Sequence, residues 1–145
     1  MIIQFATSAD LPALTPDDRV AGEALEALGV QVEAVVWSEH DAGSAGRVDA
    51  VVIRSCWDYH LREREFSAWL DRLERQDLVV INELPLVRWN LHKKYLDELQ
   101  RSGVPVVPTL WVNPGDERSL RDLLADTGWR EVVVKPAISA CAYET

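Results

Sequence analysis

Lys135 is the first residue whose type and position could do chemistry. It follows the apolar run Val132–Val134 and precedes Pro136, which predicts a lysine at the end of a buried strand. An ammonium group at such a place is a point charge suited to a phosphate oxygen. Ser139 adds a hydroxyl to the loop that follows. The alternative is an ordinary surface lysine, because Lys-Pro alone is a weak signal and the loop lacks the glycines of known phosphate-binding motifs.

A second basic group lies within residues 88–96. Lys93 and Lys94 fall in the first turns of a helix predicted over Leu91–Arg101, where the helix dipole favours anions over cations. One lysine that serves a bound anion would explain this mismatch. The alternative is a solvated basic face balanced by nearby acids such as Glu98, and this segment taken alone favours the alternative.

The loop after the third predicted strand, residues 54–60, carries a guanidinium, a hydroxyl, a carboxylate and two aromatic rings. Open α/β sheets bind ligands beyond the carboxyl ends of their strands. Arg54 could hold a substrate carboxylate through two hydrogen bonds, and Asp58 could hold an amine. In the competing interpretation, Trp57 and Tyr59 fill the end of the sheet and Asp58 caps the next helix. The sequence does not separate the two.

The cysteines and histidines form no metal-type or nucleophilic pattern. Cys56 and Cys141 lie far apart without CxxC spacing, so we expect a reduced, cytoplasmic setting. Cys56 is expected to be a small buried residue, because only His60 lies near enough in sequence to act as its base. The three histidines are scattered, and no metal site is expected on them.

The composition is that of an ordinary globular chain. Its 145 residues are 48% hydrophobic and 27% charged, which argues against disorder. The net charge of −9 opposes non-specific nucleic-acid binding. Met1–Phe5 lacks the basic region of a signal peptide, and no apolar run approaches the roughly 20 residues that span a bilayer. We therefore expect a soluble, cytoplasmic protein with no nucleic-acid or membrane partner.

The elements that would position these residues alternate between strands and helices. A helix is predicted to begin at the cap Thr15, with Val20, Leu25 and Leu28 facing inward. The other predicted elements of this part are strands at Ile2–Ala6, Val30–Trp37, Asp49–Arg54 and Leu78–Ile81 and a helix at Glu63–Gln76. This alternation favours a mostly parallel α/β domain over residues 1–85.

The pattern changes after residue 85, and residues 86–145 are predicted to begin a second domain. After the helix at Leu91–Arg101 comes an extended segment with two prolines, Val104–Thr109. A helix at Asp116–Asp126 and a strand at Glu131–Lys135 are predicted to follow.

The order of these segments resembles the ATP-grasp superfamily of carboxylate–amine ligases. The resemblance is carried by the small α/β domain, the lysine-bearing helix, the exit GVPVVPT (Gly103–Thr109) and the sequence VVVKP. Within the superfamily, RSCWDYHLREREFSAWLDRL and NELPLVRWNLHKKYLDEL are most similar to the glutathione-synthetase-like branch that includes the O-ureido-serine cyclo-ligase. The resemblance covers nearly the whole chain and corresponds to the N-terminal half of the family's enzymes.

The resemblance implies a pre-ATP-grasp α/β domain followed by the beginning of an ATP-grasp domain, and it implies a mechanism. ATP would phosphorylate a substrate carboxylate, and an amine would attack the acyl phosphate. Lys135 matches one ATP-binding lysine, and Lys93, with Lys94 as its neighbour, matches the other. Ser139 is the best candidate in the phosphate-covering loop. Arg54 and Asp58 would then face a small amino-acid-like substrate.

The resemblance also implies Mg²⁺, but the family's Mg²⁺-binding acids and electrophile-stabilising arginine correspond to positions after Thr145. Phosphoryl transfer needs such groups, so the 145-residue chain is expected to be catalytically silent by itself. The alternative function is a non-catalytic α/β module that binds a nucleotide or a partner. A homodimer is compatible with either function, the ligase or the non-catalytic module. A flavodoxin-like or receiver-like domain is opposed, because the first strand does not end in an acidic cluster or a phosphate-binding loop.

Overall fold

The computed structural model describes residues 1–40, 48–76 and 78–140, so Cys141 lies outside the described residues. Its elements in chain order are β1 (Ile2–Thr7), α1 (Pro16–Glu26), β2 (Gln31–Val36), β3 (Ala50–Ser55), the 3₁₀ helix η1 (Trp57–Leu61), α2 (Glu63–Arg75), β4 (Val79–Ile81), α3 (Leu84–Leu91), α4 (Tyr95–Arg101) and α5 (Leu120–Ala125). None of the described helices is long and apolar enough to cross a membrane.

The four strands form one parallel sheet in the order β2–β1–β3–β4. The sheet confirms the predicted α/β fold class. In β3, Ala50 and Val52 belong to the core on one face, and Val51 and Ile53 to the core on the other. All four side chains are buried, as expected for an apolar strand without alternation.

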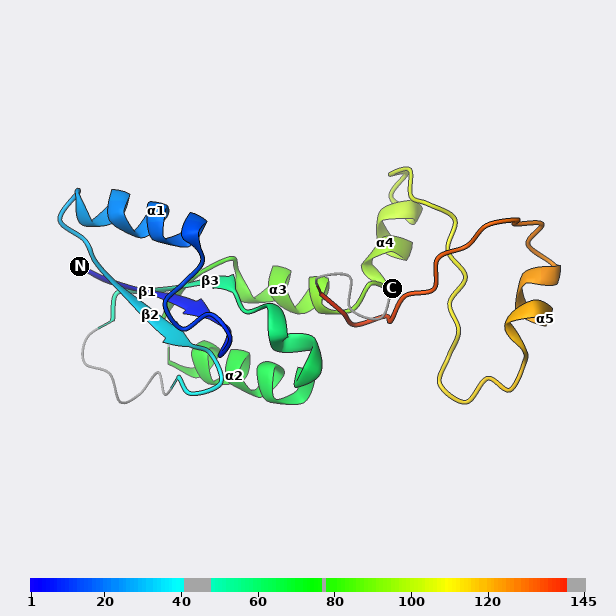
Figure 1. The fold of residues 1–145 in the computed structure, drawn as a ribbon, viewed down its shortest axis with the longest axis horizontal. Helices are drawn as coiled ribbons and strands as arrows, with labels where there is room; N and C mark the ends of the chain where they lie inside the picture. The colour runs from blue at the N-terminus through cyan, green and yellow to red at the C-terminus, as the bar shows by residue number, and fades with distance from the viewer. Residues whose placement is uncertain (41–47, 77, 141–145) are drawn as a thin grey trace.

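Helices cover both faces of the sheet. Figure 1 shows α1 on one side and α2 on the other, with α4 and α5 beyond the sheet. The larger core lies on the α2 side, where Phe66, Trp69, Leu70 and Leu73 are at most 2% exposed. These are the inward residues that the helical periodicity of α2 predicts. The sheet and α2 therefore form the rigid support for the loops at the strand ends.

The start of α1 follows the sequence signals. The Thr15 hydroxyl accepts a hydrogen bond of 3.0 Å from the backbone N–H of Asp18, and Pro16 occupies the first helical position. This cap aligns the first turn of α1 with the carboxyl end of β1.

The predicted inward face of α1 is confirmed at Leu25, which packs against the core on that side of the sheet, and is wrong at Val20 and Leu28. Val20 and Leu28 are 67% and 80% exposed, whereas Asp18 and Gly22 are buried. The helix lies close to the sheet, and a Cβ on Gly22 would stand 3.6 Å from Cγ1 of Val32. Because of this close approach, a glycine and an acid face the sheet where larger apolar side chains were expected.

The single helix predicted over Leu91–Arg101 is also wrong. The backbone of His92 is extended and ends α3, and α4 begins at Tyr95. The N–H of Lys93 donates to the carbonyl of Ala137 at 2.9 Å and not to a carbonyl of the preceding helical turn. The two lysines therefore lie in a connection between two helices and not in a first helical turn.

The last described part of the chain has fewer regular elements than predicted. Helix α5 begins only after Ser119, whose hydroxyl accepts from the N–H of Asp122, so the predicted start at Asp116 is too early. Residues 131–135 have no regular secondary structure and join no ladder among the described residues, so the predicted strand does not form there. Val133 and Val134 are 69% and 61% exposed.

Candidate functional site

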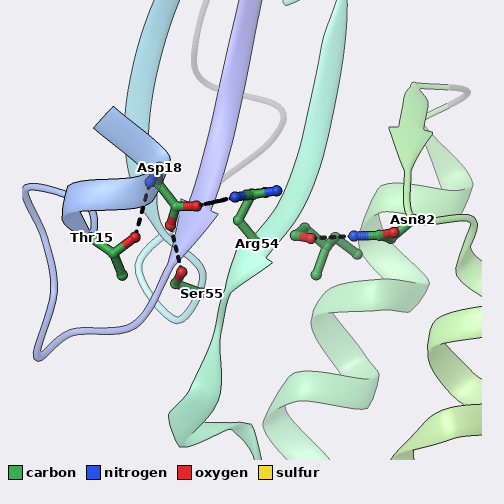
Figure 2. A network of polar contacts seen from close by, with 6 residues as sticks. Thr15, Asp18, Arg54, Ser55 and Asn82 are labelled. Carbon is green, nitrogen blue, oxygen red and sulfur yellow. Dashed lines mark hydrogen bonds and ion pairs between the residues drawn. The ribbon is translucent and has the colours of Figure 1, made fainter. Parts of the chain in front are cut away.

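Polar residues gather where β1, β3 and β4 end. Arg54 and Ser55 lie at the end of β3, Asn82 directly follows β4, and Asp18 lies in the first turn of the helix after β1. Figure 2 shows these side chains converging from the three elements. Parallel strands bring their carboxyl ends to one edge of the sheet, where α/β proteins bind ligands.

Asp18 holds Arg54 in a fixed orientation. Its Oδ1 accepts from Nε of Arg54 at 2.7 Å and lies 2.6 Å from Nη2. Its Oδ2 accepts from the hydroxyl of Ser55 at 2.5 Å. The Asp18 side chain is 2% exposed and that of Arg54 40%, so the acid is enclosed while the guanidinium reaches solvent. A planar guanidinium anchored along one edge can present its other edge to a ligand.

The electrostatics of Asp18 favour its charged form. Burial acts to raise the pKa of Asp18, but hydrogen bonds from Ser55, Arg54 and Thr15 and the charge of Arg54 outweigh it. The pKa of Asp18 therefore lies below its ordinary value, and the carboxylate stays ionised beside Arg54.

Asn82 lies at the same edge of the sheet, at the end of β4. Its backbone has a positive φ of 62°, in the left-handed region that asparagine tolerates better than most residues. Its Nδ2 donates to the carbonyl of Ile53 at 2.7 Å. This bond ties the turn after β4 to the neighbouring strand β3 and places the Asn82 amide beside Arg54.

Two adjoining cavities flank Arg54 and Asn82. The first, here called the arginine pocket, has a volume of about 250 Å³ and is lined by Thr15, Asp17, Asp18, Ile53, Arg54, Ser55, Trp57 and Asn82. The second, here called the apolar cavity, has a volume of about 320 Å³ and is lined by Ile53, Arg54, Cys56, Trp57, Tyr59, Phe66, Asn82, Leu86, Val87, Asn90 and Leu91. Together they offer a polar end and an apolar end, as small-molecule sites commonly do.

Asp58 faces the protein and not these cavities. Its Oδ1 accepts from Nε1 of Trp37 at 2.6 Å, and its Oδ2 accepts from Arg62 at 3.2 Å. The Arg62 guanidinium also stacks over the Trp37 ring, 4.7 Å from its centroid. Asp58 lines neither cavity. The predicted role of Asp58 in holding an amine therefore stays a prediction, and its observed contacts are structural.

The rest of the loop after β3 shapes the apolar cavity. Cys56 is buried, as expected, and burial together with the charge of Asp58 raises the pKa of its thiol, which disfavours the nucleophilic thiolate. Tyr59 packs against the buried ring of Phe66 with a centroid distance of 5.4 Å, whereas Trp57 is 47% exposed. Tyr59 is therefore a wall of the cavity, and Trp57 stands at its mouth.

The structure brings together the three residues that the resemblance assigns to ATP. Nζ of Lys93 donates to the Ser139 hydroxyl at 2.7 Å and to the carbonyls of Ser139 and Pro136 at 3.2 and 2.9 Å. Burial, and next the positive charge of Lys135, lower the pKa of Lys93. Lys94 is exposed. Lys93, Lys135 and Ser139 are called the lysine cluster below.

The lysine cluster adjoins the apolar cavity. The Tyr59 hydroxyl, on the wall of that cavity, lies 3.5 Å from the carbonyl oxygen of Ser139. Asn90 and Leu91, which line the same cavity, directly precede the connection that carries Lys93. The wall of the cavity therefore contacts the lysine cluster at Tyr59.

The sequence interpretation missed Asp18 and Asn82 as members of the site. Asn82 stands just beyond the carboxyl end of β4, and that position was a usable signal, whereas Asp18 lies in the first turn of the helix after β1. By local pattern, Asp18 is an acid in a first helical turn, where acids are common. Its contact with Arg54 joins residues 36 positions apart, which local patterns do not reveal.

A family model described as the N-terminal domain of D-cycloserine synthetase DcsG matches residues 3–82. The chain belongs to this family. The cycloserine biosynthesis protein DcsG of Streptomyces lavendulae is 41% identical over 117 residues, which cover 79% of this chain. A crystal structure of D-cycloserine synthetase DcsG is 36% identical and matches 97% of this chain with a TM-score of 0.81. The chain spans 38% of the curated relative and 48% of the chain in the crystal structure.

Proposed function

We propose that the chain is the N-terminal part of an ATP-dependent carboxylate–amine ligase that acts through an acyl phosphate on a small amino-acid-like substrate. The lysine cluster carries this proposal. Lys93 follows α3, whereas Lys135 and Ser139 follow α5, yet Lys93 bonds to Ser139 and feels the charge of Lys135. Two ammonium groups held close together repel each other unless an anion lies between them. The relatives, named for cycloserine synthesis, support a biosynthetic enzyme.

The lysine cluster fits the phosphates of ATP. Lys93 already uses its ammonium to donate to one hydroxyl and two carbonyl oxygens, and phosphate oxygens are stronger acceptors of the same kind. ATP, when bound, supplies the phosphoryl group that activates the carboxylate. The two lysines would offset the negative charge on that group, which is the main task of a protein in phosphoryl transfer.

Arg54 fits the substrate carboxylate. Its guanidinium borders both the arginine pocket and the apolar cavity. Tyr59, on the wall of the apolar cavity, contacts Ser139 of the lysine cluster, so a carboxylate on Arg54 and a phosphate on the lysines would bind at neighbouring places. This arrangement assigns recognition of the substrate to the sheet edge and activation to the lysines.

Mg²⁺ has no assigned ligands on the described residues. Among residues 1–40, 48–76 and 78–140, no three side chains of His, Cys, Asp or Glu gather as a metal site would require.

ATP titration of the chain and its lysine variants tests the proposal. Lys93→Met and Lys135→Met should each weaken ATP binding by roughly tenfold or more, because a hydrogen bond to a charged group contributes about 1.5–3 kcal/mol. Lys94→Met is the matched control, since Lys94 is exposed and adjacent in sequence. Equal affinity in all four proteins, or the largest loss in Lys94→Met, would refute the assignment.

A further inference from the structure

Lys93 is already bound by a loop of its own chain. Its Nζ donates to the carbonyl of Pro136 at 2.9 Å and to the carbonyl and hydroxyl of Ser139 at 3.2 and 2.7 Å. Its backbone N–H donates to the carbonyl of Ala137 at 2.9 Å. Residues 136–139 are called the proline loop below. The proline loop therefore places three carbonyl oxygens and one hydroxyl around a single lysine.

These contacts use the whole donor capacity of the Lys93 ammonium. An ammonium group has three N–H donors, and its three acceptors on the proline loop take one each. Lys93 is half-buried, whereas Lys135 is exposed. A phosphate that approaches the lysine cluster therefore reaches Lys135 directly, but it can bond to Lys93 only where it replaces an oxygen of the loop.

The oxygens of the proline loop are neutral, so they satisfy the donors of Lys93 without offsetting its charge. Within residues 1–40, 48–76 and 78–140, neither Lys93 nor Lys135 forms an ion pair with an acid. Hydrogen bonds between two charged groups are roughly twice as strong as those between neutral groups. A phosphate can thus displace the loop, but its apparent affinity is reduced by the fraction of molecules in which the loop is in place.

The proline loop is also held on its other side. The Tyr59 hydroxyl lies 3.5 Å from the carbonyl oxygen of Ser139, and the Tyr59 ring packs against the buried ring of Phe66. Ser139 therefore lies between Lys93 and a side chain that is fixed to the core. Displacement of Ser139 would separate it from Tyr59, which lines the apolar cavity.

We propose that the proline loop occupies the phosphate position of the nucleotide-free chain, that Ser139 is the positioning residue that holds it there, and that ATP must displace it from Lys93. The inference rests on the proposed function, because it takes ATP to be the ligand of the lysine cluster. Ser139 then competes with the phosphate for Lys93, whereas the resemblance implies that Ser139 binds the phosphate. The two roles predict opposite effects when the hydroxyl is removed.

ATP titration of Ser139→Ala by calorimetry tests the inference. This variant should bind ATP roughly threefold to tenfold more tightly than the unchanged chain, because the shortest bond between the loop and the ammonium is lost while Lys93 remains. Lys93→Met should bind ATP more weakly. Ser139→Thr keeps a hydroxyl and should match the unchanged chain. Ser102→Ala is the matched control, because the Ser102 hydroxyl donates to the carbonyl of Glu98 and not to the proline loop.

Amide hydrogen exchange without nucleotide tests the contact itself. The backbone N–H of Lys93 is protected by its bond to Ala137. In Ser139→Ala this amide should exchange roughly threefold faster or more, because the loop leaves Lys93 more often. Ser139→Thr and Ser102→Ala should leave the exchange rate unchanged. An equal rate in Ser139→Ala and the unchanged chain would overturn the role of Ser139.

The outcomes distinguish this inference from the proposed function. ATP that binds the unchanged chain and is weakened by Lys93→Met, but binds Ser139→Ala no more tightly, would overturn the competition and leave the ATP site standing. ATP that binds neither the unchanged chain nor Ser139→Ala would overturn the ATP site and the competition together. Tighter binding by Ser139→Ala with weaker binding by Lys93→Met is the result that supports both.

Discussion

Asp58→Ala should lower the free energy of unfolding by about 2–3 kcal/mol. Asp58 accepts a hydrogen bond of 2.6 Å from Trp37, whose side chain is only 1% exposed. Hydrogen bonds to charged groups contribute about 1.5–3 kcal/mol, and the substitution leaves a buried donor unpaired. The ion pair with Arg62, at 3.2 Å and partly exposed, adds only about 0.3–0.5 kcal/mol. The contact with Trp37 therefore dominates.

Urea denaturation followed by circular dichroism measures this loss. Glu65→Ala is the control, because it removes the other carboxylate near Arg62, at 3.7 Å and 65% exposed, without touching Trp37. Its effect should stay below about 0.5 kcal/mol. A double-mutant cycle of Asp58→Ala with Trp37→Phe should give a coupling energy of about 1–2 kcal/mol.

The same variant decides between two roles for Asp58. An unchanged free energy of unfolding, together with weaker binding of an amine-bearing substrate, would show that Asp58 is a ligand and that its contact with Trp37 stabilises nothing. A destabilised protein that binds the amine-bearing substrate with unchanged affinity would show the structural role.

Two further predictions concern the core and the pH. Leu73→Ala should lower the free energy of unfolding, measured by urea titration, by about 2–5 kcal/mol because Leu73 is 0% exposed. Leu61→Ala, at 60% exposure, should change it by less than about 0.5 kcal/mol. Equal losses in the two variants would show that Leu73 does not belong to the core. The pKa of Asp18 is lower in the folded chain than its ordinary 3.8, so its stabilising effect is present above that pH and is lost as the pH falls through the folded value. The difference in unfolding free energy between the unchanged chain and Asp18→Asn should therefore shrink below about pH 4. A difference that stays constant with pH would refute the lowered pKa of Asp18.

The sheet could be predicted because its strands are short apolar runs bounded by turn residues. β3 is apolar without alternation, and such a run indicates a strand covered on both faces. The start of α1 could be predicted from Thr15 and Pro16, since capping acts over only three or four residues. These features depend on local sequence and on burial alone.

The site depends on contacts that local patterns do not encode. The helix break at Lys93 arises because its N–H and its ammonium both bond to the segment that contains Pro136 and Ser139. The burial of Asp18 depends on how closely α1 approaches the sheet, where a Cβ on Gly22 would already be in van der Waals contact with Val32. Periodicity reports which residues of a helix are apolar, but it does not report how far the helix lies from its neighbour.

The central position of β1 has a consequence for the order in which the chain is built during synthesis. β1 and β2 are neighbours in the sheet and are joined through α1, so residues 1–36 contain the first pair of adjacent strands to emerge. β3 joins the opposite edge of β1 and emerges later, by about 1–4 s at common synthesis rates. Until then Asp18 has neither Arg54 nor Ser55 as a partner. The arginine pocket is therefore absent from any nascent form that lacks β3, and the docking of that strand both completes the sheet and satisfies the carboxylate.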